Sequence, residues 1–596
     1  MKTPDETNPV ACESRWAGWL RRKPHARHCR RVAFALSVAI LGFTSISHAA
    51  GDRRTVTEPT TPPPPYCATL VASLPALSPT AFTPPRVFDT ATEDNPPDTA
   101  RINSALVTCG NASNAGASPQ VVRLSGNGTN VSFLAGPIIL QTGTTLLIDP
   151  GVTLYASRNA NEYYTSTSGS TCGTLDVSSS GCKNWITINS GSSRRAKNIS
   201  VIGPGIIDGR GDARITFTDG TGGTKNQDLS CNPNCSWWDL AHEADLAGSN
   251  QNNPRMMQLN DTDNVVLYSL NLRNSPKFFV ASTRLSGVTA WGLSIFSPEG
   301  QSRNTDAFDP NGSDWTITQN YISVDDDDVA IKGGTVLASG APSAQFMSVV
   351  HNHFYTGHGM SIGSETNAGV NDVLVDDLTI DGADNGLRIK SDRSRGGIVT
   401  GINYNNVCMR NVNRRNIGNS GALVFSAYYT ANAVGNLPPD YRDVHVHNVH
   451  SITPSPLYFV GYDAAHPLNI QLDNVIIDGV TQDQITASDA NVVLGPGPVN
   501  FTPFGPDVNV SNQITAPSEP PVACGPDRFV PFVSAGVACD TNADGAVDRN
   551  DIAAIMAARG FSVFPRDPRD VDGDGVVTVL DARACVSRCT RAQCAP

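Results

Sequence analysis

The amino-acid sequence predicts an all-β protein, a right-handed parallel β-helix, followed by a small α-helical C-terminal domain. Three observations lead to this fold class. Short strand patterns follow one another through residues 66–514, with almost no helical periodicity between them. Successive patterns begin roughly 23 to 35 residues apart, as the coils of a solenoid do. Near the C-terminus two acidic loops replace the strand patterns, and a helical pattern at residues 552–559 follows the first of them.

Each strand pattern has a polar turn and then a short run of alternating apolar residues, which is typical of a strand with one buried face. The clearest examples are residues 264–272, 287–295, 314–322, 371–380 and 469–477. In a solenoid, each coil buries its inward side chains against the coils above and below it. A β-sandwich or a propeller would instead show hairpin turns and a more regular period. One helical pattern lies among the strands, at residues 237–246.

The N-terminal residues 1–50 have the pattern of a secretory signal. An apolar stretch at residues 32–46 follows two arginines and precedes small residues at positions 47–50. This stretch is too short to span a membrane. We therefore expect a secreted protein without a membrane span, whose mature chain begins near Gly51.

Two proline-rich stretches divide the mature chain, at residues 51–65 and 515–523. Such segments favour extended polyproline geometry and act as spacers. They predict a β-helix domain at residues 66–514 and a separate domain at residues 524–596.

The cysteine count predicts disulfides. Without residues 1–50, 12 of the 14 cysteines remain, an even number in an exported chain. Cys172 with Cys182 and Cys231 with Cys235 are near neighbours and plausible pairs. Of these 12 cysteines, seven lie before residue 500 and five after it. These odd counts leave open one unpaired thiol in each part or a bridge between the parts.

Four short motifs carry the chemistry: Asn304-Thr305-Asp306, the acidic run Asp325–Asp328, Gly357-His358-Gly359 and Arg388-Ile389-Lys390. Together they supply three or more carboxylates, one imidazole and two cations. Acid/base cleavage of a glycosidic bond in an anionic sugar would need these groups. On consecutive coils of a solenoid, the motifs can stack into one surface strip.

With its motifs in this order, the chain resembles glycoside hydrolase family 28, the polygalacturonases. The matching stretches are residues 304–309, 326–332, 357–364 and 386–390. Residues 236–240 and 274–276 look most like the bacterial endo-acting members.

The resemblance implies roles for the motif residues. Asp326 would be the general acid, Asp306 and Asp327 would activate water from the other face, and His358 would tune the acid. The substrate-binding residues would be Arg388 and Lys390, which hold a galacturonate carboxylate, and Asn304. The family inverts configuration, consistent with an acid and a base roughly 6.5 to 9.5 Å apart. No cofactor is expected for catalysis.

The acidic run allows three choices of adjacent pair, and the family's spacing to Ala330 selects Asp326 and Asp327. Asp325 and Asp328 stand where the family usually has other residues. We expect the crowded carboxylates to raise one another's pKa and so to keep the acid protonated. Taken alone, the run would be a solvated loop or a cation site; the companion motifs favour the catalytic interpretation.

The chain carries a formal net charge of −12, which would repel a polyanion, and no nucleic-acid partner is expected. Binding of pectin or polygalacturonate therefore requires a local basic cleft. We expect it to contain Arg303, Lys332, Arg388, Lys390, Arg393 and Arg395.

The C-terminal domain carries two twelve-residue loops, 540–551 and 570–581. Oxygen ligands stand at positions 1, 3, 5, 9 and 12, with glycine at position 6, as in EF-hand-like calcium loops. The predicted ligands to structural Ca²⁺ are Asp540, Asn542, Asp544, Asp548, Asp551, Asp570, Asp572, Asp574, Thr578 and Asp581. Both loops resemble the duplicated type I dockerin module, which implies a cohesin-like partner. Positions 10 and 11 differ between the two repeats, however, and five cysteines crowd the module.

We therefore expect a secreted endo-polygalacturonase that hydrolyses α-1,4-galacturonosyl bonds with inversion. The alternatives within the family are an exo-polygalacturonase and a rhamnogalacturonan hydrolase. Outside it, a pectate lyase would need catalytic calcium and leave an unsaturated product, and a non-catalytic β-helix would only bind polysaccharide.

Overall fold

The structure is a computed structural model, and it describes residues 51–77, 87–114, 119–165, 172–176, 181–191, 193–218, 226–337, 339–512, 520, 522–533, 538–542, 546–563, 567–590 and 592–595. The expected signal segment, residues 1–50, lies outside the described residues. So does most of the expected linker 515–523, of which residues 520, 522 and 523 are described.

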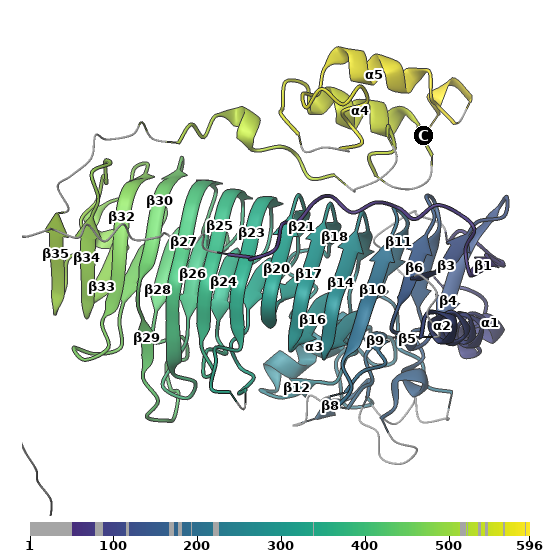
Figure 1. The fold of residues 1–596 in the computed structure, drawn as a ribbon, viewed down its shortest axis with the longest axis horizontal. Coiled ribbons are helices and arrows are strands. Elements are labelled where there is room, and N and C mark those ends of the chain that lie inside the picture. Colours follow the sequence, from purple (N-terminus) through teal and green to yellow (C-terminus); the bar gives the residue numbers. More distant parts are fainter. Residues whose placement is uncertain are drawn as a thin grey trace, which may run out of the picture. The chain divides into compact units, whose positions relative to one another are not determined.

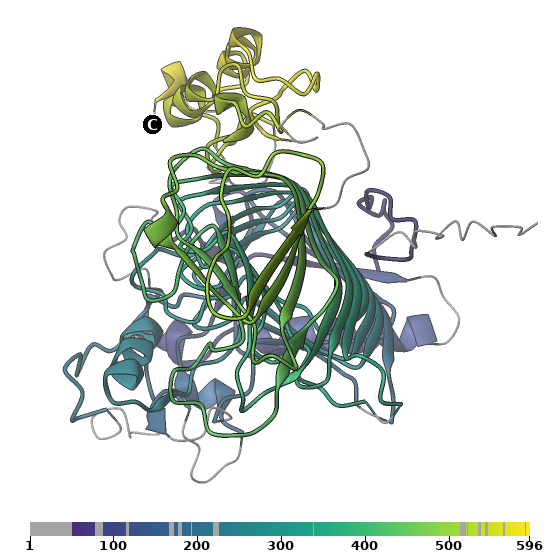
Figure 2. The ribbon, with the colours of Figure 1, turned by 90° about the vertical axis from the view of Figure 1, so that its left-hand side faces the viewer.

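Parallel strands make up most of the described chain and stack into successive coils, which overlap when viewed along the stack (Figures 1 and 2). Within the described residues, one sheet has 22 strands and another has 11. The larger sheet consists of two ladders that meet at β23, which pairs with both β20 and β21. The prediction of a mostly β protein with parallel sheets is confirmed.

The strands have the following bounds. The first ladder contains β1 (Ala68–Val71), β3 (Gln120–Ser125), β6 (Thr144–Ile148), β10 (Ala196–Ile202), β14 (Thr262–Tyr268), β17 (Leu285–Trp291) and β20 (Gly312–Thr318). The second contains β2 (Leu74–Pro75), β4 (Asn130–Ala135), β7 (Thr153–Ala156), β11 (Ile206–Asp208), β15 (Asn271–Arg273), β18 (Ser294–Phe296) and β21 (Tyr321–Ser323). Beyond their junction the sheet continues as β23 (Ala344–Phe354), β25 (Val370–Asp381), β27 (Gly397–Arg410), β29 (Pro439–Tyr441), β30 (Val444–Ser451), β32 (Leu468–Ile477), β34 (Ala490–Leu494) and β35 (Val508–Asn512).

The 11-stranded sheet carries the sequence motifs. It contains β5 (Ile138–Leu140), β9 (Ile186–Ile188), β13 (Met257–Asn260), β16 (Val280–Thr283), β19 (Phe308–Asp309), β22 (Val329–Ile331), β24 (Met360–Gly363), β26 (Leu387–Lys390), β28 (Leu423–Ser426), β31 (Leu457–Val460) and β33 (Ile485–Ser488). A separate antiparallel pair consists of β8 (Leu175–Asp176) and β12 (Asn250–Gln251).

Three of the five predicted strand patterns divide into two strands at a corner. Ser269 and Gln319 adopt positive φ angles of 56° and 57° at two of these corners, and Gly292 adopts 65° at the third. A residue in this left-handed region turns the chain sharply. The patterns at 371–380 and 469–477 contain residues of the same kind, such as Asp377 at 50° and Asn474 at 57°, but each pattern lies within one continuous strand, β25 or β32.

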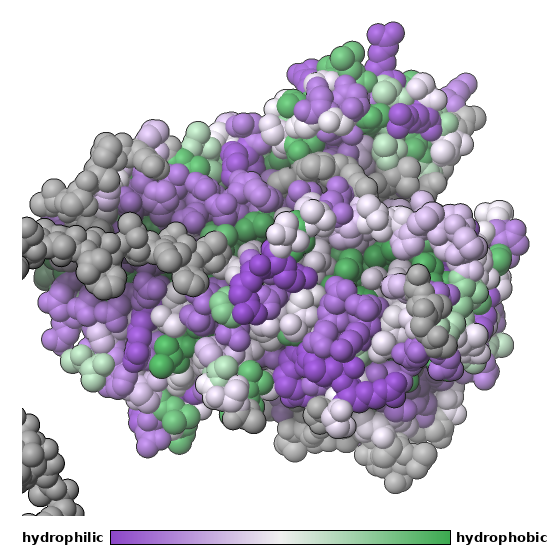
Figure 3. All heavy atoms as spheres, in the orientation of Figure 1, coloured by the Kyte–Doolittle hydropathy of each residue, from purple (hydrophilic) through white to green (hydrophobic). Residues whose placement is uncertain are grey.

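The core of the stack is built from registered apolar columns. One column runs through five coils: Ala290, Ile317, Val349, Val375 and Tyr404. All five side chains are fully or almost fully buried. A buried aliphatic side chain of this kind contributes about 1.5 to 3 kcal/mol. On the face seen in Figure 3, by contrast, the described surface is mostly polar, with hydrophobic residues in small separate patches.

Helices cover the first coils and flank the motif sheet. They are α1 (Thr90–Asp94), α2 (Thr99–Asn114) and α3 (Trp237–Leu246), with 3₁₀ turns at η1 (Ala160–Tyr163), η2 (Gln482–Gln484) and η3 (Pro526–Arg528). The buried residues Ile102 and Leu106 of α2 join the core of the stack, so this helix closes an end that would otherwise expose apolar side chains. The predicted helix at residues 237–246 is confirmed as α3. None of the helices in the described part of the chain has the length and apolar character that crossing a membrane requires.

Six disulfides are present among the described cysteines. The expected pairs Cys172–Cys182 and Cys231–Cys235 are confirmed. Cys408–Cys524 joins strand β27 to the chain beyond residue 514, so of the two alternatives left open by the odd counts, the bridge is the one that forms. The other three bonds are Cys67–Cys109, Cys539–Cys585 and Cys589–Cys594.

Parts of the proline-rich regions and their flanks are bonded to the large sheet. Arg53 pairs with Asp314 at 2.7 Å. Beyond the second region, Arg528 pairs with Asp377 at 2.5 Å, and the Tyr355 hydroxyl donates to the carbonyl of Val530 at 2.7 Å.

The C-terminal domain contains two helices, α4 (Arg549–Ala557) and α5 (Val579–Val586), and the 3₁₀ turn η4 (Ala592–Cys594). Each helix begins with a capping box, in which the first and fourth residues satisfy each other's backbone amides. The boxes are formed by Asp548 with Asp551 and by Thr578 with Asp581.

Candidate active site

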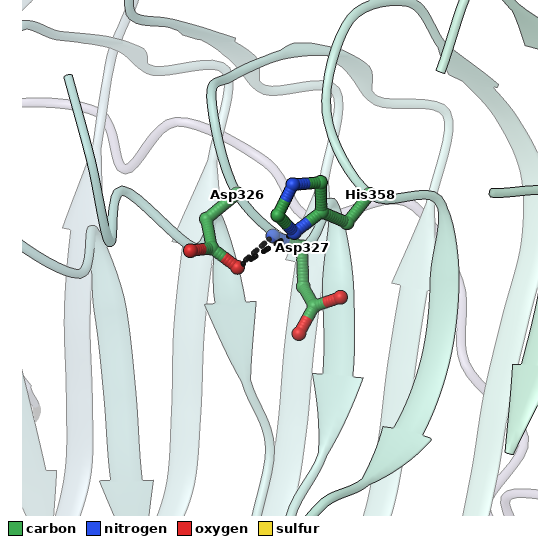
Figure 4. A group of neighbouring side chains, drawn as sticks. All are labelled: Asp326, Asp327 and His358. Atoms are coloured by element: carbon green, nitrogen blue, oxygen red, sulfur yellow. Dashed lines mark hydrogen bonds and ion pairs between the residues drawn. The ribbon is translucent and has the colours of Figure 1, made fainter. Parts of the chain in front are cut away.

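The register of the 11-stranded sheet brings the four motifs together. The first residues of four strands pair in a row: Phe308, Val329, Met360 and Leu387. Asp306, Asp327 and His358 each stand two residues before one of these positions, so they occupy equivalent sites on successive coils. Residues 325–328 form bends before β22 and are not part of a strand. The neighbouring Asp326 and Asp327 can therefore both serve the same region, although their side chains point in different directions (Figure 4).

Asp326 is the carboxylate of this group that reaches the cleft. Its side chain is 17% exposed, and its Oδ1 lies 3.1 Å from Nδ1 of His358. The backbone N–H of Asp327 donates to the same oxygen at 2.9 Å. The second oxygen, Oδ2, accepts one long hydrogen bond of 3.3 Å from the side-chain amide of Asn304.

Asp327 is buried beneath the cleft and bonded to the cation pair. Nζ of Lys390 lies 2.6 Å from its Oδ2, Nη1 of Arg388 lies 3.7 Å from its Oδ1, and the Ser361 hydroxyl donates to Oδ1 at 2.7 Å. Burial raises the pKa of Asp327, but Lys390 and Arg388 outweigh it and hold the pKa below its usual range. In the ligand-free protein, an anion of the protein itself thus lies between the two cations.

Asp306 is also buried, but its surroundings raise its pKa, whereas those of Asp327 lower it. Burial and then the charge of Asp326 raise the pKa of Asp306 well above its usual value, although Lys332 lies 3.7 Å away. Its Oδ1 has no hydrogen-bond partner among the residues that the structure describes. This carboxyl group is therefore more readily protonated than Asp326 or Asp327.

The expectation that crowding keeps Asp326 protonated is wrong for the free protein. Burial raises the pKa of Asp326, but His358, Lys390 and the amide of Asp327 together hold that pKa well below its usual range. The neighbouring carboxylates do raise a pKa, but it is the pKa of Asp306, which lacks these donors. The sequence revealed four neighbouring carboxylates, whereas the distribution of N–H donors around each one appears only in the structure.

The outer two aspartates of the run hold loops in place. Asp325 accepts hydrogen bonds from the backbone N–H groups of Gly300 and Ser302, at 2.7 and 3.0 Å. Asp328 is buried and accepts from the N–H of Gly359 at 2.9 Å. Burial raises the pKa of Asp328 well above its usual value. Neither residue lies where Asp326 lies, so the register chosen from the sequence agrees with the geometry.

A cleft of about 1020 Å³ opens above Asp326. Its lining includes Asn304, His358, Arg388 and Lys390, together with α3 residues such as Trp238 and an aromatic pair, Tyr428 and Tyr429. Asp306 and Asp327 are not part of the lining; they lie below it. Of the three aspartates expected to be catalytic, one is thus accessible from the cleft and two are buried.

The basic groups of the cleft differ in part from the expected set. Arg303, Arg388 and Lys390 line it, as expected. Three other members of that set are bonded elsewhere: Lys332 to Asp306, Asp309 and Glu365, Arg395 to Glu365, and Arg393 to the carbonyl of Gly435. Arg415 lines the cleft but was not predicted, because it follows the last motif by a loop and no sequence spacing marks it.

The second of the predicted calcium loops brings three of its five predicted ligands together. One carboxylate oxygen from each of Asp570, Asp572 and Asp574 lies within 4.8 Å of the other two. Asp581 accepts N–H groups from Val571 and Thr578, at 2.7 Å each, and does not join this group. The predicted ligand Thr578 likewise donates its hydroxyl to Asp581, because both belong to the capping box of α5.

The first loop shows the same arrangement as far as it is described. Asp551 accepts N–H groups from Thr541 and Asp548, at 2.8 Å each. Asp540 and Asp548 are buried, and Asn542 is bonded through its carbonyl to Arg273 at 2.6 Å. Asp544 lies outside the described residues.

Comparison with known proteins gives consistent matches. The sequence model of glycosyl hydrolases family 28 matches residues 140–494, more than half of the chain. A polygalacturonase from Ralstonia nicotianae is 36% identical, with 82% of this chain and 93% of that protein covered. An endo-polygalacturonase from Pectobacterium carotovorum subsp. carotovorum is 37% identical, with 74% and 93% covered.

Solved structures show the same relationship. The polygalacturonase from Erwinia carotovora ssp. carotovora has 35% sequence identity and a TM-score of 0.59, with 74% of this chain and 99% of that chain covered. The family 28 exopolygalacturonase of Yersinia enterocolitica, at 20% identity, a TM-score of 0.50 and coverage of 70% and 73%, is similar in fold.

Proposed function

The chain belongs to glycosyl hydrolase family 28, and we propose that it is a secreted endo-polygalacturonase that hydrolyses α-1,4-galacturonosyl bonds of polygalacturonate with inversion. That it is a glycoside hydrolase with polygalacturonase activity follows from the family and from its relatives. Endo action, inversion, secretion and the roles of individual residues are the proposed part.

One observation carries the proposal: an accessible carboxylate, Asp326, stands above a buried carboxylate, Asp327, that two cations keep ionised. Hydrolysis with inversion needs one carboxyl group that gives a proton to the leaving oxygen and another that takes one from water. An oxygen of Asp326 and one of Asp327 lie within 4.8 Å of each other, closer than the expected separation, so inversion is proposed from the family resemblance and not from this distance. Two carboxylates in such different surroundings can divide these tasks.

Asp326 is the proposed general acid. Its Oδ1 accepts two hydrogen bonds, whereas Oδ2 accepts a single long one, so Oδ2 is the oxygen left to carry the proton toward the leaving group. A charged His358, its hydrogen bond and Lys390 hold the pKa of Asp326 low. An anionic substrate bound at the cations would oppose their charge and raise that pKa toward the range a general acid needs.

Asp306 and Asp327 are the proposed activators of the water. Asp327 is the acceptor that stays ionised, because Lys390 and Arg388 keep its pKa low, although a low pKa also makes it the weaker base of the two. Asp306 lies on the neighbouring coil with a raised pKa, so it is suited to take up a proton. Arg388 and Lys390, both in the cleft lining, are the proposed contacts for a galacturonate carboxylate.

Endo action is supported by the similarity to endo-polygalacturonases of Pectobacterium at 37 and 38% identity. Secretion is supported by the six disulfides, since such bonds form and persist in oxidising compartments.

Calcium binding is proposed for the C-terminal domain as an EF-hand-like, dockerin-like module. Asp570, Asp572 and Asp574 fit a Ca²⁺ ion because they place three hard oxygen donors together, bonded to backbone N–H groups and not to a cation of the described residues. When bound, the ion would neutralise this cluster and tie the loop to α5. No observation indicates a partner, so cohesin-like binding stays a prediction from the sequence.

The test is the product profile on polygalacturonate, followed by size and by absorbance, with and without a chelator. A broad mixture of saturated oligomers in both conditions is expected. Monomer or dimer from the first minutes would contradict endo action, and unsaturated ends that vanish with the chelator would identify a lyase.

A further inference from the structure

Arg415 occupies a position beside the proposed acid that the family motifs do not account for. It lies in the loop between β27 and β28 and lines the cleft. Its Nη1 donates to Oδ1 of Asp325 at 2.7 Å, and its Nε and Nη2 donate to Oδ2 of Asp384 at 2.8 and 2.5 Å. Its Nη2 also lies 3.3 Å from Nε2 of His358.

In the contact between Arg415 and His358, only Arg415 can be the hydrogen-bond donor. A guanidinium group is always protonated and can only donate hydrogen bonds. Nε2 of His358 must therefore accept, so it carries no proton in this contact. The single ring proton is then on Nδ1, which faces Oδ1 of Asp326 at 3.1 Å.

Asp384 is the group that would favour a doubly protonated, charged His358. Its Oδ2 lies 3.5 Å from Nε2 of His358, and a free carboxylate there would attract a second proton to the ring. However, this oxygen already accepts two N–H groups of Arg415, and 3.5 Å is too long for a good hydrogen bond.

The charged groups around His358 come from several elements. They are Asp326 and Asp327 before β22, Asp384 before β26, and Arg415 from the β27–β28 loop, which also pairs with Asp325 and Glu299. Of these, Arg415 is the cation, and it lies against the nitrogen whose protonation would charge the ring.

We propose that Arg415 is a positioning residue that keeps His358 uncharged, with its single proton on Nδ1 and directed at Asp326. This inference deepens the proposed function and rests on it, since the state of His358 matters to catalysis only if Asp326 is the general acid.

The consequence concerns the ease with which Asp326 is protonated. A neutral imidazole donates a hydrogen bond to Asp326 but does not attract its negative charge as an imidazolium would. After burial, the charge of His358 is the largest influence on the pKa of Asp326, and it lowers that pKa. The low pKa of Asp326 at the candidate site includes the charge of a protonated His358. An uncharged ring removes that part of the lowering while the hydrogen bond remains, so Asp326 is protonated more readily and can serve as an acid.

The test is the pH profile of kcat on polygalacturonate for Arg415→Gln. Without the guanidinium, Asp384 is free to accept a hydrogen bond from Nε2, so His358 takes a second proton and Asp326 becomes harder to protonate. The alkaline limb should move to lower pH by roughly one unit, equivalent to about a tenfold loss at a fixed pH on that limb.

Two further variants separate this role from a structural one. Arg414→Gln is the matched control, because within the described part of the chain Arg414 binds Glu299 and the carbonyl of Gly382 and not His358; its alkaline limb should not move. In Arg415→Gln/Asp384→Asn the competing carboxylate is also gone, so the limb should return toward its original position.

A folded Arg415→Gln protein that loses activity equally at every pH would overturn the inference. If that variant does not fold, the Asp384→Asn variant provides the test. The alkaline limb of its pH profile should stay in place or move to higher pH, and a shift of that limb to lower pH would refute the inference. A wild-type protein without activity on polygalacturonate would instead refute the proposed function.

Discussion

Two clusters of aspartates in this molecule are crowded to a similar degree but are stabilised in different ways. At the start of β19 and β22, Asp306 and Asp327 lie near cations from other coils, Lys332 and Lys390. In the loop before α5, the bonds that Asp570 accepts within the described chain come from backbone N–H groups, those of Gly573 and Gly575 at 2.8 Å each. Burial and then the neighbouring Asp581 and Asp574 raise the pKa of Asp570, against the pull of the two glycine amides.

The difference indicates what each cluster still lacks. The β-helix supplies its own counter-charges at fixed positions, so its carboxylates can have different protonation states and divide the work of acid and base. The C-terminal loop supplies oxygen donors without a counter-charge, so an added cation would complete it. Crowded carboxylates thus mark a catalytic site in one region and a candidate ion site in the other.

The largest expected effect comes from removing the proposed acid. Asp326→Asn should lower kcat by about 10³- to 10⁴-fold, because general acid catalysis acts in the transition state, while substrate binding persists. Steady-state kinetics and a binding isotherm on oligogalacturonate measure both. Asp328→Asn is the control from the same run and should keep its activity. Near-normal turnover in folded Asp326→Asn would remove this residue from the mechanism.

A smaller loss should follow from removing one of the cations. Arg388→Ala should reduce kcat/KM on polygalacturonate by roughly 10- to 100-fold, the value of a charge-assisted hydrogen bond, and much less on fully methyl-esterified pectin. Arg395→Ala, whose guanidinium pairs with Glu365 outside the cleft lining, is the control. Equal losses on the two substrates would mean that Arg388 serves only to hold Asp327.

Asp328, the last aspartate of the acidic run, should affect stability and not activity. Asp328 has a raised pKa in the folded state, so the folded protein binds more protons than the unfolded chain and loses stability as pH rises through that pKa. Asp328→Asn removes this dependence and gives the unpartnered Oδ1 position a donor. We expect a gain of about 1 kcal/mol at neutral pH and little change near pH 3. If the variant and the wild type had equal denaturation midpoints at both pH values, the prediction would be contradicted.

The smallest effect on activity should come from removing calcium. Chelation should raise hydrogen exchange in residues 567–590, since metal binding is coupled to folding of the loop, but change hydrolysis of soluble substrate by less than about twofold. Asp572→Asn should make this segment insensitive to calcium, whereas the exposed Asp507→Asn should not. Loss of hydrolysis on chelation would place a required calcium ion in the β-helix and support the lyase alternative.

Much of the fold and the placement of the motifs could be predicted from the sequence. The strand repeat predicted the parallel stack, and the motif spacing predicted that Asp306, Asp327 and His358 would meet, because residues at one offset from registered strands share one edge. Corners such as Gln319 were missed, since a polar residue within a strand pattern carries no clear mark of a positive φ.

The electrostatics of the site could not be predicted in the same way. Which aspartate carries a raised pKa depends on whether N–H groups or cations face it, and these come from distant coils. Arg415 reaches Asp325 across 90 residues of sequence from a loop without a recognisable motif. The sequence likewise left two alternatives for the odd cysteine of each part, an unpaired thiol or a bridge between the parts, and the structure shows the bridge from Cys408 to Cys524.

The central claim is that Asp326 protonates the leaving oxygen while a carboxylate on the other side, Asp306 or Asp327, activates water. The most direct test is the anomeric configuration of the first product, followed by ¹H NMR at high enzyme concentration before mutarotation. The account predicts that the β-anomer of the new reducing end appears first from the α-linked substrate. If the α-anomer appears first, or the new end is unsaturated, the account is contradicted.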